Sequence, residues 1–233
     1  KYDELPRREE NRVPAATLRD RYARDGRQLA VCVDRVDYTK GIPERLKALG
    51  LLWNTHPELR GRLTFLFVCT PSRSSVTAYV QLEREVAEGV MALNAKYGSA
   101  DWTPIVLINA NVDAELLAGV YRAADLCLVS SLQDGMNLVA KEFIASQTDE
   151  RGVLLLSRFA GAAEDIDGAV LINPFNVDGF VSALRITLEM PGEERRKRMR
   201  RMRRRLKNNT IFDWLESILA RGSDIMSQQT QPG

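Results

Sequence analysis

Short apolar runs alternate with amphipathic segments along most of this chain. The runs are nearly continuous in Val, Leu, Ile, Phe and Cys, a pattern typical of strands that are covered on both faces. They are residues 28–34, 63–69, 105–108, 125–129, 152–156 and 169–172. The segments between them repeat apolar residues at helical spacing and predict helices at about 43–54, 75–96, 113–123, 137–147, 160–165 and 177–190. This alternation predicts an α/β fold with a doubly wound, Rossmann-like parallel sheet.

The pattern divides the chain into three parts. Residues 1–27 form a polar lead-in segment with one short helical stretch near its end, residues 28–191 form the Rossmann-like domain, and residues 192–233 form C-terminal helices and a polar tail. In the last part, Asn208-Asn209-Thr210 predicts the end of one helix and the cap of the next.

Composition places the chain among globular proteins, with 45% hydrophobic and 27% charged residues in a length of 233. No run reaches the roughly 18 apolar residues that a membrane span needs, and the first residues lack the apolar core of a signal peptide. We therefore expect a cytoplasmic protein that does not bind membranes.

Cysteine and histidine content excludes several kinds of site. Cys32, Cys69 and Cys127 lie far apart, each inside a predicted strand, and so indicate buried free thiols rather than disulfides or a zinc cluster. The one histidine, His56, lies where a helix is predicted to end. A Ser-His-Asp mechanism or a His-rich metal site is therefore not expected.

The net charge of the chain is only +2, but one segment is strongly basic. Residues 193–207 hold ten cations, with Met199, Met202 and Leu206 as the apolar positions. Such a helix could bind nucleic acid or an acidic surface. We favour a solvated helix at the domain edge, because its acids come first and its bases last, as the helix dipole prefers, and no aromatic residues are interleaved for base stacking.

Two predicted loops carry cations at strand ends. Arg35 and Lys40 follow the first strand and precede a glycine and a helix, where together they could neutralise a diphosphate. An ordinary surface pair between Arg35 and Asp37 explains the same residues equally well. Arg73, after the second strand, is a weaker candidate for contact with an anion.

The fourth predicted strand leads through small polar residues into a helix start, which offers unpaired N–H groups to phosphate or sugar oxygens. The backbone groups concerned are those of Gly135, Met136, Asn137 and Leu138. Asp134, at or next to the N-cap, could accept hydrogen bonds from sugar hydroxyls, and Glu142 could accept those of a ribose. A plain N-cap and a surface glutamate paired with a nearby cation are the alternatives.

Several of these segments resemble the trehalose-6-phosphate synthase family of retaining glycosyltransferases. The matching stretches are DRVDYTKG at 34–41, KYG at 96–98 with WTP at 102–104, DGMNLVAKE at 134–142, GVLLLSRFAGAA at 152–163 and INPF at 172–175. The resemblance is to the C-terminal, donor-binding half of that family. It implies a two-domain GT-B fold, with the active site between two Rossmann-like domains and a nucleoside-diphosphate-glucose donor.

The resemblance also implies roles for individual residues. Arg35 and Lys40 would hold the donor diphosphate and act in catalysis, Asp134 would bind glucose hydroxyls, and Glu142 would bind the ribose. Arg73 would reach the phosphate of the acceptor. Backbone groups would complete the donor site at Gly135, Met136, Asn137 and Leu138. The loop at 109–113 would hold the base through its backbone, which leaves UDP-, GDP- and ADP-glucose open.

The acceptor stays open between two families that share these blocks. Trehalose-6-phosphate synthases, which use glucose 6-phosphate, often have Thr-Pro-Leu-Arg before the DGMN sequence, whereas this chain has Ser130-Ser-Leu-Gln133. A histidine common near position 111 in the trehalose enzymes is also absent. Glucosylglycerol-phosphate synthases, which use glycerol 3-phosphate, resemble them through the same segments. We expect trehalose 6-phosphate as the product, with the second acceptor or a non-catalytic nucleotide-sugar-binding module as alternatives.

The resemblance implies that the acceptor binds mainly to an N-terminal domain. We expect that domain to be missing from this chain, and the chain to be inactive alone. No cofactor and no metal are expected, because protein cations would neutralise the leaving diphosphate. Phe212, Trp214 and Leu215 would pack a last helix against the missing domain. Binding of nucleic acid is not expected, and a homo-oligomer is left open.

Overall fold

The computed structural model describes residues 12–70, 77–208 and 219. Arg73 therefore lies outside the described residues, as do Phe212, Trp214 and Leu215. Within the described part of the chain, no helix is long and apolar enough to cross a membrane.

In the described part of the chain, six parallel strands form one sheet in the order β3-β2-β1-β4-β5-β6. The strands are β1 (Gln28–Arg35), β2 (Leu63–Thr70), β3 (Ile105–Asn109), β4 (Leu126–Val129), β5 (Val153–Ser157) and β6 (Val170–Ile172). The sheet confirms the predicted fold class. Strand order reverses between β1 and β4, and in open α/β sheets ligands bind at such a switch point, beyond the carboxyl ends of the strands.

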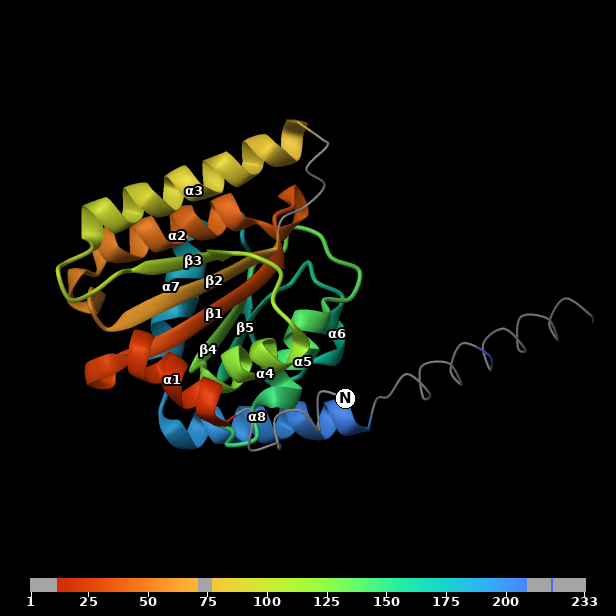
Figure 1. Cartoon of the computed structure of the whole chain (residues 1–233). Coiled ribbons are helices and arrows are strands. Elements are labelled where there is room, and N and C mark those ends of the chain that lie inside the picture. The colour runs from red at the N-terminus through yellow and green to blue at the C-terminus, as the bar shows by residue number, and fades with distance from the viewer. Residues whose placement is uncertain (1–11, 71–76, 209–218, 220–233) are drawn as a thin grey trace, which may run out of the picture.

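Helices cover both faces of this sheet (Figure 1). One layer holds α2 (Ile42–Thr55), α3 (Thr77–Tyr97) and α7 (Val177–Leu188). The other holds α1 (Arg12–Tyr22), α4 (Ala114–Ala123), α5 (Leu138–Ser146), the short α6 (Ala162–Asp165) and α8 (Gly192–Lys207). Single 3-10 turns lie at Arg24–Gly26, Tyr38–Lys40 and Pro57–Leu59. The six helices predicted between and after the strands are present with ends that differ by at most two residues, and α1 begins earlier than the short stretch that the pattern suggested. The helix predicted after Thr210 lies outside the described residues.

Strand residues alternate between two cores because successive side chains point to opposite faces of a sheet. Leu29 and Val31 pack under the layer of α4 and α5, whereas Ala30 and Cys32 pack under α2 and α7. All three cysteines are buried and free, as predicted. Burial raises the pKa of the Cys32 thiol to about 12, so this side chain behaves as an apolar core residue.

The basic helix α8 is packed into the fold rather than standing clear of it. Met199 and Met202 are buried in the core beside α5. Arg203 donates to the carbonyl oxygens of Ile144 and Ala145 at the end of α5. Arg195 donates to the Thr187 and Leu188 carbonyl oxygens at the end of α7 and to that of Met190 just beyond it. Arg195 and Arg203 thus satisfy carbonyl groups at helix ends. Most other cations of α8 are exposed, as predicted for a solvated helix at the domain edge.

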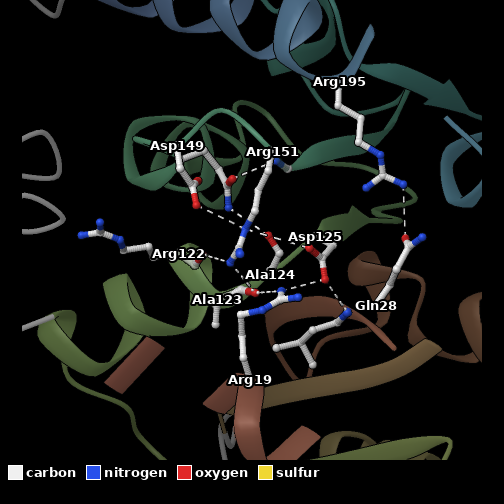
Figure 2. Close-up of polar contacts among 12 residues, drawn as sticks. Arg19, Gln28, Arg122, Ala123, Ala124, Asp125, Asp149, Arg151 and Arg195 are labelled. Atoms are coloured by element: carbon white, nitrogen blue, oxygen red, sulfur yellow. Dashed lines mark hydrogen bonds and ion pairs between the residues drawn. The ribbon is translucent and has the colours of Figure 1, made fainter. Parts of the chain in front are cut away.

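Polar side chains join the elements at the amino-terminal edge of the sheet (Figure 2). Asp125, directly before β4, accepts from the Leu29 amide at 2.9 Å and from Arg19 of α1 at 2.8 Å. Arg151 donates to the Arg122 carbonyl at 2.7 Å and lies 3.9 Å from the Asp125 carboxylate. Asp125 was predicted within the strand. Instead β4 begins at Leu126, and the carboxylate fixes α1 and the start of β1.

We predict that Asp125→Ala lowers the free energy of unfolding by about 2–4 kcal/mol, because a buried amide and a guanidinium lose their acceptor. Glu88→Ala is the control, since its pair with Arg84 is 3.9 Å long and both side chains are more than 60% exposed. That change is expected to alter the same free energy by less than about 1 kcal/mol. Urea denaturation of both variants measures the difference, and equal losses would contradict the role of Asp125.

Candidate functional site

Two loops meet at the switch point, one after β1 (residues 36–41) and one after β4 (residues 130–137). The Leu132 amide donates to the Thr39 carbonyl at 2.7 Å. Gly41 has φ 62°, and a Cβ added there would lie 2.3 Å from the Ser130 carbonyl oxygen. Glycine is therefore required at position 41, both for its left-handed backbone and for the close approach of the loops.

Lys40 and Asp134 form an ion pair between these loops, with 2.6 Å from Nζ to Oδ2. The two side chains are only 17% and 15% exposed. Asn137 donates to the same carboxylate oxygen at 3.0 Å. Partial burial raises the pKa of Asp134, but hydrogen bonds from Lys40 and Asn137 outweigh it and hold the pKa below its ordinary value. Two predicted site residues, 94 positions apart, are thus brought together.

The N-cap of α5 is Asn137 and not Asp134, which corrects the sequence-based assignment. The Asn137 side-chain oxygen accepts from the Ala140 amide at 3.0 Å. Its backbone has φ 75°, a value that asparagine tolerates better than most residues. Asp134 lies three residues before the cap. Its carboxylate binds Lys40 instead of the helix start. The helix start still points its first-turn N–H groups toward the switch point.

Gly135 lies in open space, since a Cβ added there would meet no atom within 4 Å. Its φ is not positive. The protein's own packing therefore does not require glycine at position 135. The loop after β5 supports this segment from below: Gly161 donates to the Asp134 carbonyl at 2.9 Å. A Cβ on Gly161 would lie 2.2 Å from the Gly135 carbonyl oxygen, so packing demands glycine at position 161 rather than at position 135.

Arg35 ends β1 at the same edge of the sheet as Lys40. Its guanidinium lies 3.8 Å from the Asp37 carboxylate, too long for a hydrogen bond, and its side chain is 58% exposed. The surface pair that competed with a ligand role is therefore present but loose. Arg35 keeps donors available at the rim of the switch point.

Glu142 lies one turn along α5 from Leu138, on the same side of the helix. Its Oε2 accepts from the Tyr121 hydroxyl at 3.0 Å, so its partner is a tyrosine rather than the cation that the alternative assumed. Tyr121 itself is fully buried in α4. Sequence reasoning assigned no role to Tyr121, because the contact joins two helices.

The sequence analysis also missed Arg45, which is fully buried and pairs with Asp34 at 2.7 Å beneath the two loops. Its position gave a usable signal. Arg45 falls three residues after Ile42 and four before Leu49, on the buried face of α2. A charged residue at a core position of an amphipathic helix indicates a buried partner.

Known proteins match this chain along most of its length. The family model of glycosyltransferase family 20 matches residues 7–223. The chain belongs to glycosyltransferase family 20. It is 42% identical over 194 residues to a trehalose-6-phosphate synthase of Sinorhizobium fredii, which covers 83% of this chain and 42% of that protein. It is 40% identical over 190 residues to a UDP-forming synthase of Dictyostelium discoideum, covering 82% of this chain and 26% of that protein.

Solved structures of this family share the fold. A UDP-forming trehalose-phosphate synthase from Burkholderia xenovorans in complex with glucose 6-phosphate superposes with a TM-score of 0.88 and 36% identity, over 94% of this chain and 48% of that one. A protein from E. coli bound with UDP-2-fluoro glucose gives a TM-score of 0.83 and 36% identity, over 88% and 46% of the two chains. The chain thus spans about half the length, or less, of the relatives it matches.

We predict a pH dependence of stability from the Lys40–Asp134 pair. Because the folded pKa of Asp134 lies below its ordinary value of 3.8, the pair stabilises the fold above that pH. This stabilisation is lost as the pH falls through the lowered pKa. The difference in unfolding free energy between the original chain and Asp134→Asn should therefore be constant above about pH 5 and shrink below about pH 4. Denaturation curves at several pH values test this, and parallel curves down to pH 2.5 would contradict it.

Proposed function

We propose that this chain binds the donor of a retaining glucosyltransferase, a nucleoside diphosphate glucose, at the β1/β4 switch point. The observation that carries the proposal is the convergence of Lys40, Asp134 and the first turn of α5 at one edge of the sheet. Membership of glycosyltransferase family 20 supports the same assignment.

The Lys40–Asp134 pair suits a sugar nucleotide because it places a cation next to an anion, and the two can bind different parts of the same ligand. An ammonium binds phosphate oxygens, whereas a carboxylate accepts hydrogen bonds from sugar hydroxyls. In the donor, the diphosphate is attached to the anomeric carbon of the glucose, so the phosphate oxygens lie close to the sugar hydroxyls. We propose that Lys40 takes the diphosphate and Asp134 takes the glucose hydroxyls. Glu142, oriented by Tyr121, would accept from the ribose.

The reaction that this arrangement favours is departure of the nucleoside diphosphate. Negative charge grows on the leaving phosphate, and Lys40, Arg35 and the positive end of α5 lie where they would stabilise it. The acceptor hydroxyl would attack from the face that the leaving group vacates, with the leaving phosphate taking its proton, which retains configuration. The proposal includes no metal, because protein cations supply the positive charge, and turnover unaffected by EDTA is the result expected of it.

UDP-glucose is the donor we propose, since the relatives from Dictyostelium and Burkholderia are described as UDP-forming. Glucose 6-phosphate is the proposed acceptor and trehalose 6-phosphate the product. Because the chain spans about half of its solved relatives, we propose that acceptor binding requires a further domain. Comparing glucose 6-phosphate with glycerol 3-phosphate in the complete protein tests the acceptor, and a preference for the latter would replace the trehalose assignment.

Lys40→Met is the first test of the donor site. We expect it to weaken binding of UDP-glucose to this chain at least tenfold, and to lower turnover of the complete protein by about two to four powers of ten, because a preorganised charge contact is lost. Calorimetric titration with UDP-, GDP- and ADP-glucose measures affinity and base preference together. Lys47→Met, at an exposed position of the same helix α2, is the matched control and should bind like the original chain. Failure of the original chain to bind any of the three donors would overturn the proposed function.

Gly135→Ala is a second, independent test. The added methyl group meets no protein atom, so the melting temperature should change by no more than about 2 °C. The same methyl group would occupy the space proposed for the donor, so affinity for UDP-glucose should fall at least about tenfold. Unchanged affinity in a folded Gly135→Ala protein would show that the donor does not lie against this segment.

A further inference from the structure

A complete ion pair is buried directly beneath the proposed donor site. Arg45 has no exposed surface, and the Asp34 side chain is 3% exposed. Burying two charges is costly even when they are paired, and well-packed apolar residues often replace such a pair without loss of stability. Stability alone is therefore a weak explanation for a charge at this position, which makes its remaining contacts informative.

Those contacts lead to the loop that carries Lys40. Arg45 Nε donates to Ser130 Oγ at 3.0 Å. The same hydroxyl lies 3.1 Å from the carbonyl oxygens of both Lys40 and Gly41. Because the guanidinium can only donate, the hydroxyl proton of Ser130 is free to point toward these carbonyl groups. Arg45 thus orients Ser130, and Ser130 ties the end of β4 to the backbone of Lys40.

The guanidinium is held on a third side as well. Its central carbon lies 5.1 Å from the centroid of the Phe67 ring, a cation–π arrangement. Among the described residues, Arg45 Nη1 has no hydrogen-bond partner. A planar fork that bridges Asp34 and Ser130 while resting on an aromatic face is a geometry that lysine does not reproduce.

We infer that Arg45 and Ser130 are positioning residues for the donor site, which hold the loops after β1 and β4 at the separation where Lys40 meets Asp134. This inference rests on the proposed function for its catalytic meaning. Its geometric part does not, since the Lys40–Asp134 contact is made by the protein's own side chains. The alternative is a buried pair that only stabilises the fold.

Ser130→Ala is the variant that separates these explanations, because it removes one hydroxyl and leaves both charged pairs in place. Ser146→Ala is the matched control. Ser146 is also fully buried, and its hydroxyl has no hydrogen-bond partner among the described residues. Both variants are compared under conditions where circular dichroism shows that they are folded.

The first measurement needs no ligand. NMR titration of the Asp134 carboxyl group reports how closely Lys40 approaches it. We expect the pKa of Asp134 to rise toward its ordinary value in Ser130→Ala and to stay unchanged in Ser146→Ala. An unchanged pKa in a folded Ser130→Ala protein would overturn the inference, whatever the chain binds.

The second measurement uses UDP as the probe. Ser130→Ala should weaken UDP affinity about five- to tenfold at full binding stoichiometry, whereas a partly unfolded protein would lose stoichiometry instead. In a Lys40→Met background the same change should weaken UDP binding less than about twofold, because the effect acts through Lys40. Equal losses in both backgrounds would contradict positioning. If the original chain does not bind UDP, the proposed choice of UDP-glucose as donor fails, and the ligand-free titration still decides the role of Ser130.

Arg45→Lys provides a further check. It keeps the positive charge beside Asp34 but lacks the fork that reaches Ser130. We expect it to reproduce the Asp134 titration and the UDP affinity of Ser130→Ala. Behaviour like the original chain would show that charge alone is sufficient and that orientation of Ser130 is not required.

Discussion

The site depends on the separation of β1 and β4 at their carboxyl ends. Their paired positions end at Val31 and Cys127, although β1 continues to Arg35 and β4 to Val129. The chain leaves β1 for α2 on one face of the sheet, and leaves β4 for α5 on the other. The carboxyl ends of the two strands are therefore joined by side chains rather than by a backbone ladder, which creates room for a ligand.

Side-chain connections at this point are more specific than a continued ladder would be. A ladder pairs any residue with any other, whereas Asp34, Arg45 and Ser130 must each be present for the contacts beneath the loops to form. The resulting arrangement is buried and paired underneath and open above. Gly135, which has empty space around it, lies on the open side. This division between a packed support and an exposed rim is what a preorganised binding site requires.

The architecture could be predicted well from the sequence, because burial on both faces of the sheet gives each strand a nearly continuous run of apolar residues. The sequence also placed Lys40 and Asp134 at one edge, since parallel strands bring their carboxyl ends together. It did not predict that these two would pair, or that Asn137 would cap α5. Both depend on the backbone path between Ser130 and Leu138. That path is determined by contacts with residues far away in the sequence, such as the contact of Asp134 with Lys40, 94 positions away. Tyr121 was missed for the same reason, because its partner lies on another helix. Arg45, in contrast, carried a signal in its position on the buried face of α2.

Charge balance at the switch point bears on how a donor would bind. Lys40 is matched by Asp134 and Arg45 by Asp34, so the two close pairs carry no net charge. Arg35, loosely placed 3.8 Å from Asp37, is the more adaptable cation at the rim. An incoming diphosphate would then have to share Lys40 with Asp134, while Arg35 and the α5 amides supply additional positive potential. Sharing is favourable only if Asp134 receives hydroxyl donors in return, as a sugar provides. Under the proposed function, the pair would therefore favour a sugar diphosphate over a simple phosphate, because only the former would satisfy both partners at once.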